Sequence, residues 1–202
     1  MQPPGDDNMG HLKVMAGIGG VCVQWALLEH LALGLIAGIE GNALDKIYLM
    51  FGSLDMKPRL DMAINLATAA KVPTSLVQHI RAVRTALRDE RLSDRRNQAI
   101  HGAHKASDEP DSIQLTMPRW GEPRRTETVS VIDLYNLSRR LHSLGSEIDA
   151  IATEVHEWKM RVLNNRLEHS KRQAAEAGTS LLVKIAKNLN ARRQNFWRKL
   201  NR

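Results

Sequence analysis

The stretch Asp94-Arg95-Arg96-Asn97-Gln98-Ala99-Ile100-His101-Gly102-Ala103-His104 decides how the fold of this chain is interpreted. Helical geometry of about 100° per residue places Asp94 and Asn97 on the same stripe as His101. The stripe continues backward through one polar and four apolar residues, Glu90, Leu87, Val83, Ile80 and Leu76. A helix face that begins apolar and becomes polar leads to a solvent-filled cleft or to bulk solvent, because unpaired buried polar groups are costly.

The apolar residues of this stretch lie on the side of the helix opposite to its polar stripe. They are Leu92, Ala99, Ile100 and Ala103. We therefore predict packing on two sides of this segment, or a kink near Ser93. The helix itself is predicted to begin near Thr74, where Val72-Pro73-Thr74-Ser75 supplies a break and capping residues.

The motif Arg96-Asn97-x-x-x-His101, which closes a long helix and is followed by Gly102, resembles the Arg-x(4–6)-His signature of HEPN domains. The resemblance extends to the layout of residues 12–158, which has an apolar first helix, a helical pair, the motif helix, a short β-like excursion and a further long helix. HEPN domains are all-helical and usually dimeric, and many are metal-independent RNases of toxin–antitoxin and antiviral systems. The resemblance therefore implies an all-α, HEPN-like helical bundle that forms a homodimer. It also implies an endoribonuclease that acts as a toxin or defence effector with no cofactor, and it leaves open an antitoxin or other partner protein.

The same resemblance implies roles for the motif residues. His101 would be the acid or base, Arg96 would contact the phosphate, and Asn97 would position one of them. These residue types suit cleavage of RNA by its own 2′-hydroxyl, because imidazole titrates near neutral pH and a guanidinium group matches phosphate oxygens. Arg95 and His104, beside the motif, are expected to contact the RNA.

The spacing of the motif constrains the geometry of such a site. Arg96 and His101 are separated by about 140° around a helix, so their side chains do not face one another. Asn97 and His101 share a face. A two-fold dimer would bring Arg96 of one copy towards His101 of the other, because the same patch meets itself in a two-fold interface. We therefore expect activity to require dimerisation.

Structural roles for the same residues form the alternative hypothesis. Arg96 can pair with Asp94 or Glu90, and His101 can bind a carbonyl at the helix C-terminus, with Gly102 as a partial stop. The chain would then be a non-catalytic HEPN-like helical module that binds RNA or a partner protein. The pair His101-x-x-His104 supplies too few ligands for zinc, and no metal site is expected.

Two alternating segments predict a small β-hairpin inserted among the helices. Residues 113–117 and 126–131 alternate in polarity as strands do, and residues 118–125 join them as a loop. The residues between His104 and the first strand are polar and predict another loop.

The loop of this hairpin is a candidate RNA-binding segment. Trp120 lies among Arg119, Arg124 and Arg125, and could stack on a base while the arginines contact phosphates. The alternative is that Trp120 fixes the hairpin to the helical bundle.

Further helices are predicted at residues 43–51 and 57–71. A long amphipathic helix follows the hairpin, because apolar residues recur there at intervals of three and four. These residues are Leu134, Leu137, Leu141, Leu144, Ile148, Ile151 and Val155.

Residues 14–39 are the most apolar part of the chain and could span a membrane by length. Gln24, Glu29 and His30 lie near the middle, where charged groups are expensive in lipid. We therefore predict a buried first helix and no membrane partner. Residues 1–11, rich in Pro, Gly and Asp, are predicted to be disordered.

The basic character of the chain is concentrated at its C-terminus. Residues 159–202 contain twelve Lys and Arg against two Glu, which gives +10, and the remaining residues carry 17 basic against 20 acidic side chains, or −3. This segment is predicted to be a basic helical extension of the domain at residues 12–158, with a helix cap at Gly178-Thr179-Ser180. Its last helix carries an apolar stripe and could meet RNA, anionic lipid, a partner protein or the main bundle. Cys22 is the only cysteine, which suits a reducing cytoplasm.

Overall fold

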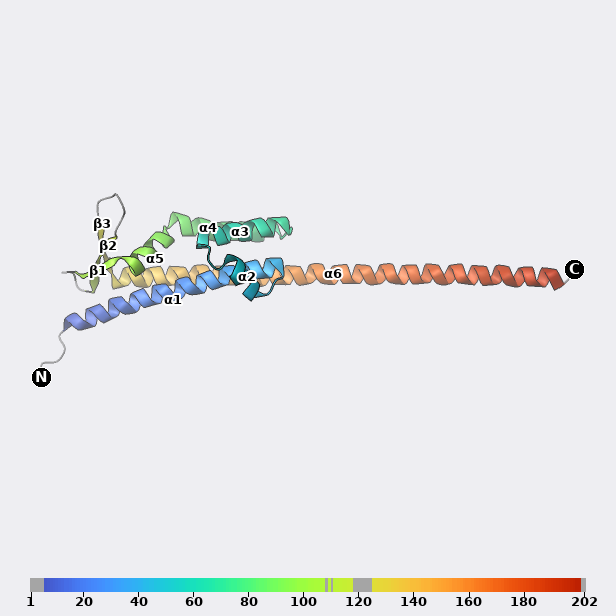
Figure 1. Ribbon diagram of the computed structural model, residues 1–202, viewed down its shortest axis with the longest axis horizontal. Coiled ribbons are helices and arrows are strands. Elements are labelled where there is room, and N and C mark those ends of the chain that lie inside the picture. The colour runs from blue at the N-terminus through green and yellow to red at the C-terminus, as the bar shows by residue number, and fades with distance from the viewer. Residues whose placement is uncertain (1–5, 108, 110, 118–124, 201–202) are drawn as a thin grey trace. The chain divides into compact units, whose positions relative to one another are not determined.

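The computed structural model describes residues 6–107, 109, 111–117 and 125–200. Over these residues the chain is mostly helical and has one small antiparallel sheet (Figure 1). The elements are α1 (Asp6–Glu40), α2 (Leu44–Phe51), α3 (Met56–Ala69), α4 (Thr74–Asp89), α5 (Leu92–His101), β1 (Ala103–Ala106), β2 (Ser112–Met117), β3 (Arg125–Ser130) and α6 (Val131–Leu200). The chain divides into two compact units, Met1–His156 and Glu157–Arg202, so the second unit contains only the later part of α6.

α1 is the central helix of the first unit. Its buried apolar residues recur at helical spacing and include Val14, Ile18, Val21, Trp25, Leu28, Ala32, Leu35, Ile36 and Ile39. The sequence predicts this buried helix correctly. Residues Gly10–Glu40 are also long and apolar enough to cross a membrane, with a mean hydropathy of 1.6 over an 18-residue window, a test that the core helix of a water-soluble protein passes too.

Glycines allow α1 and the first part of α6 to approach closely. A Cβ atom added to Gly17 would lie 3.0 Å from the Cβ of Leu134, and one added to Gly20 would lie 3.3 Å from the Oγ of Ser138. Both contacts advance in the same direction along the two helices, which therefore run parallel (Figure 1). A parallel pair needs a long connection, and the elements from α2 to β3 provide it.

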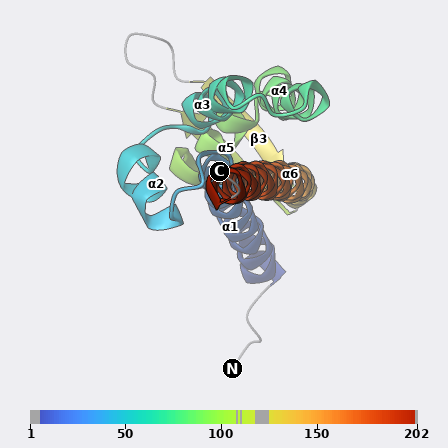
Figure 2. The same ribbon diagram turned by 90° about the vertical axis from the view of Figure 1, so that its right-hand side faces the viewer.

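The predicted apolar stripe of α6 is confirmed. All seven of its residues are buried, namely Leu134, Leu137, Leu141, Leu144, Ile148, Ile151 and Val155. α3 and α4 pack against each other as a helical pair beside α1 (Figure 2).

The sheet has one strand more than the sequence predicts. The predicted hairpin is present as β2 and β3, with Ser112 opposite Ser130. β1 pairs antiparallel with β2, with Ala103 opposite Thr116, and its Lys105 and Ala106 lie where we expected a polar loop. That expectation was wrong because four residues with a lysine and a histidine show too short an alternation to indicate a strand. Backbone pairing with β2 holds them extended.

Two helices extend farther than the sequence predicts. α6 continues through Gly178, which we expected, with Thr179 and Ser180, to cap a separate last helix. Glycine lowers helix stability by only about 1 kcal/mol relative to alanine, and the neighbouring Ala174, Ala175 and Ala177 favour the helix. At the other end α1 begins at Asp6, so residues 6–11, predicted to be disordered, are helical.

The close approach of α1 to α6 generates a stability prediction. Gly17→Leu should lower the free energy of unfolding by about 1–3 kcal/mol, because the new side chain must displace Leu134. Gly19→Leu is the matched control, since nothing lies within 4 Å of its added Cβ, and it should leave stability equal or slightly higher. Chemical denaturation measures both, and equal effects of the two changes would contradict the proposed close contact.

Candidate functional site

The polar stretch of the motif begins where α4 ends. Arg91 has a left-handed backbone conformation, with φ 52° and ψ 37°, and α5 starts at Leu92. A left-handed residue cannot continue an α-helix, so the predicted single motif helix is two helices. The break lies two residues before the kink expected near Ser93, and it allows Leu92 to be fully buried.

α5 has an apolar side and a solvent-exposed polar side. Leu92 and Ala99 are buried in the core. Asp94, Asn97 and His101, which the spacing places together on the opposite side, are all exposed. The stripe therefore meets both alternatives of the sequence interpretation, since Glu90 and Asp94 line a cavity and Asn97 and His101 face bulk solvent.

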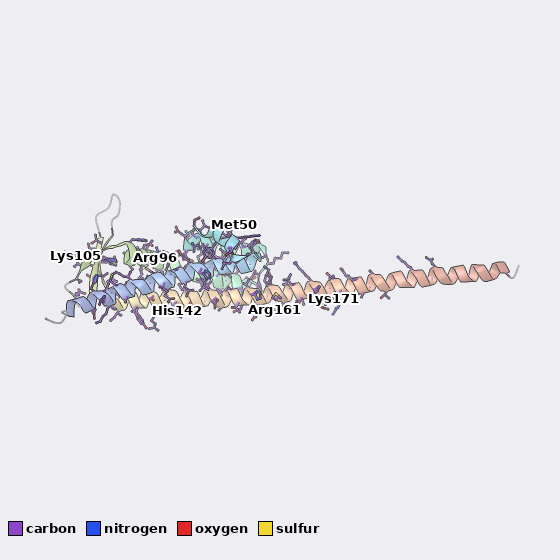
Figure 3. The ribbon with its side chains drawn as sticks, turned by 60° about the horizontal axis from the view of Figure 1, so that its bottom comes forward. Met50, Arg96, Lys105, His142, Arg161 and Lys171 are labelled. Carbon is purple, nitrogen blue, oxygen red and sulfur yellow. The ribbon has the colours of Figure 1, made fainter. Side chains whose placement is uncertain are left out.

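Arg96 lies between these two sides of α5 and extends towards α1 (Figure 3). Its Cζ atom is 5.3 Å from the centre of the Trp25 ring. Its Nη1 donates a hydrogen bond of 2.8 Å to Oδ1 of Asn97. Arg96 thus lies next to Asn97 but faces away from His101, which agrees with the angle expected from their spacing.

Arg96 does not form the ion pairs that the alternative hypothesis offered. Asp94 pairs with Arg91 at 3.1 Å, and Glu90 pairs with Arg140 of α6 at 2.6 Å. The structural partner of Arg96 is the tryptophan ring, and the two carboxylates named by the alternative hypothesis pair with other arginines.

The two motif histidines have different surroundings. His101 is the last residue of α5 and is exposed. His104, in β1, donates from Nε2 to the carbonyl of Ala99 at 3.1 Å, so it is this histidine that binds a carbonyl at the helix end. Gly102 follows the last residue of α5 and lies close to β2, because a Cβ atom added to it would lie 3.5 Å from the Cβ of Leu115. Both histidines are exposed, and His101 is the one that lies on the same face of α5 as Asn97.

A cavity of about 350 Å³ lies between α5, the sheet and the start of α6. Arg91 and Arg95 line it together with five carboxylates, Asp89, Glu90, Asp94, Glu127 and Asp133. Some of the lining residues bind one another. Arg91 pairs with Asp94 at 3.1 Å, and Gln98 donates a hydrogen bond of 3.2 Å to Glu127. Among the predicted RNA contacts whose side chains the structure describes, Arg95 lines this cavity and His104 does not. The excess of carboxylates makes the cavity unsuited to phosphate.

Three of the predicted RNA-binding residues, Arg119, Trp120 and Arg124, lie outside the described residues. Arg125 begins β3, and its side chain is also outside the described part. Across the residues that the structure does describe, no group of three or more His, Cys, Asp or Glu is arranged to hold a metal ion.

Sequence reasoning missed Trp25 as a neighbour of the motif. Trp25 lies 71 positions before Arg96 and is 5% exposed, so it has the pattern of any buried residue of α1. Only the presence of an arginine on the side of α5 next to the core indicates that an aromatic or acidic partner must lie opposite.

No family model matches this chain, and no match was found among curated proteins or solved structures.

The Glu90–Arg140 pair beside the motif generates a prediction about pH. Hydrogen bonds from Arg140 lower the pKa of Glu90 below its usual 4.5. A lowered carboxyl pKa contributes stability that is fully present above pH 4.5 and is lost as the pH falls through the folded-state value. Glu90→Gln should therefore lower the free energy of unfolding near pH 7 by about 0.5 kcal/mol, a small effect because water screens the partly exposed pair.

The difference between wild type and Glu90→Gln should disappear in strong acid, which denaturant titrations at a series of pH values would measure. Glu147→Gln is the control. Glu147 lies 3.5 Å from Arg140, farther than the 2.6 Å of Glu90, so its replacement should lower stability by less. A difference that grew as the pH fell would contradict the assignment.

Proposed function

We propose that this chain is a metal-independent endoribonuclease of the HEPN type that acts as a toxin or defence effector. The observation that carries the proposal is the arrangement on α5, where Asn97 and His101 are exposed on one face and Arg96 is held beside Asn97. The histidine supplies the acid or base, and the arginine supplies a fixed positive charge for the phosphate.

The proposed active form is a homodimer. Within one chain Arg96 extends towards Trp25, on a different side of α5 from His101. A second copy related by a two-fold axis supplies the missing partner, because each motif then meets the other. The exposed face of Asp94, Asn97 and His101 is the surface available for that contact.

A non-catalytic helical module is the second candidate function. The contact between Arg96 and Trp25 favours it, because a cation over a buried ring stabilises the fold without any substrate. A module of this kind would bind RNA or a partner protein and would not cleave.

A cleavage assay on mixed cellular RNA with EDTA present separates the two candidates. Wild type should cleave, with a bell-shaped dependence of rate on pH, and His101→Ala and Arg96→Ala should each lower the rate by about 100-fold or more. His79→Ala, which removes an exposed histidine from α4, is the matched control and should retain full activity. A folded wild type that leaves RNA intact would support the non-catalytic module.

Mixing two inactive variants tests whether the site is shared between copies. In a mixed dimer of Arg96→Ala and His101→Ala, one of the two sites contains neither residue and the other contains both. An equal mixture should therefore recover about a quarter of the wild-type rate after subunit exchange. Each variant alone stays inactive, and a mixture that also stays inactive would mean that the residues do not act across a dimer.

The basic end of α6 supports RNA as the partner. Residues 177–200 of this helix contain six Lys and Arg and no Asp or Glu. Lys184 and Lys187 are exposed there. A helix of this charge attracts a polyanion and releases its counterions, so affinity should depend steeply on salt.

Neutralising Lys184 and Lys187 together to glutamine should reduce the slope of log K against log salt by about 1.4 for single-stranded RNA. Lys171→Gln is the control, because its ammonium group already pairs with Glu168 at 2.8 Å and should contribute less. Filter binding or fluorescence anisotropy at several salt concentrations measures the slope. An unchanged slope in the double variant would remove this helix from the RNA-binding surface.

A further inference from the structure

We propose that Trp25, held in place by Glu29, is a positioning residue that sets the orientation of Arg96 for the cleavage reaction. The inference rests on the proposed ribonuclease function. It follows from a series of contacts that crosses α1 and begins at a buried arginine of α3.

The first contact of the series anchors Glu29. Arg59 of α3 is the one charged residue buried among those described, at 5% exposed. Its Nη2 donates to the carbonyl of Gly52 at 2.7 Å, and its Nη1 lies 3.8 Å from Oε2 of Glu29. Because a buried guanidinium needs nearby acceptors and negative charge, it holds this carboxylate in place.

The second contact fixes the ring of Trp25. Its indole Nε1 donates to Oε1 of Glu29 at 2.8 Å, and the side chain is 5% exposed. Tryptophan has only two side-chain torsions, so tight packing together with one directed hydrogen bond leaves the ring a single orientation. Glu29 therefore connects Arg59 to Trp25.

The third contact is between the fixed Trp25 ring and Arg96. Its guanidinium lies over the Trp25 ring with Cζ 5.3 Å from the centre, while Nη1 binds the neighbouring Asn97. Its Nε is buried and forms no hydrogen bond with any described residue. The ring and this one hydrogen bond together thus decide how the guanidinium is oriented.

An arginine already oriented before RNA arrives can bind the developing charge of the phosphate without first losing its rotational freedom. Trp25 is buried and has no access to substrate, so its contribution is through Arg96 alone. Loss of the ring should consequently reduce kcat more than it changes KM, because the affected interaction strengthens in the transition state.

Two substitutions at Trp25 test this role. Trp25→Leu removes the aromatic face, and we expect kcat to fall at least tenfold with KM changed by less than about threefold. Trp25→Phe keeps an aromatic face for the guanidinium but loses the hydrogen bond to Glu29, so kcat should fall by less than in Trp25→Leu and stay below that of wild type. Leu28→Val is the control for a general loss of packing on α1, and it should lower stability but leave kcat unchanged.

Chemical rescue gives a readout that a purely structural role would not change. Millimolar guanidinium should restore part of the cleavage by Arg96→Ala, because Trp25 still offers the surface over which the cation binds. The same addition should not restore cleavage by the double variant Trp25→Leu, Arg96→Ala. Equal rescue of both proteins would overturn the positioning role.

The two proposals fail in different ways. If wild type does not cleave RNA, the ribonuclease function is wrong and the positioning role is lost with it. If wild type cleaves and Trp25→Leu keeps its kcat within twofold while remaining folded, only the positioning role is overturned. A double-mutant cycle on the unfolding equilibrium should show Trp25 and Arg96 coupled by about fivefold to thirtyfold, and additive effects would also overturn it.

Discussion

The packing of α1 is the constraint on which the rest of the first unit depends, since four different elements contact this one helix. The glycine side accommodates α6 at Gly17. Trp25 meets α5, Glu29 meets α3, and His30 binds the hydroxyl of Tyr48 on α2 at 2.7 Å. A polar residue in the middle of α1 is therefore a connection to a neighbouring element, which explains how so apolar a helix carries an acid and a histidine.

This arrangement divides the motif between the interior and the surface. α5 is short and rests on Leu92 and Ala99, so Asn97 and His101 face solvent while Arg96 reaches the ring of Trp25. Fold stability and the proposed chemistry then depend on the same arginine. An arginine at this position can therefore be retained for fold stability or for catalysis. Kinetic measurements are needed to distinguish these two roles.

The parts of the fold that follow a regular period could be predicted from the sequence. The stripe from Leu134 to Val155 and the alternation in β2 and β3 repeat often enough to be recognised. The left-handed turn at Arg91 has no glycine or proline to mark it, and it depends on burial of Leu92 in a core that the other helices form. The partners of the motif could not be predicted either. Trp25 and Arg140 are distant in sequence from Arg96 and Glu90 and contact them only through tertiary packing.

The parallel pairing of α1 with α6 also has a consequence for how the protein is made. Gln24 and His142 contact each other at 3.3 Å although they are 118 positions apart in the chain. During synthesis the first helix leaves the ribosome long before its partner exists, and its apolar side stays uncovered until the intervening elements have been translated. Contacts of such long range also slow the search for the native state. The nascent chain is therefore expected to depend on chaperones until α6 emerges, and a protein shortened before Leu134 would keep an aggregation-prone helix without its cover.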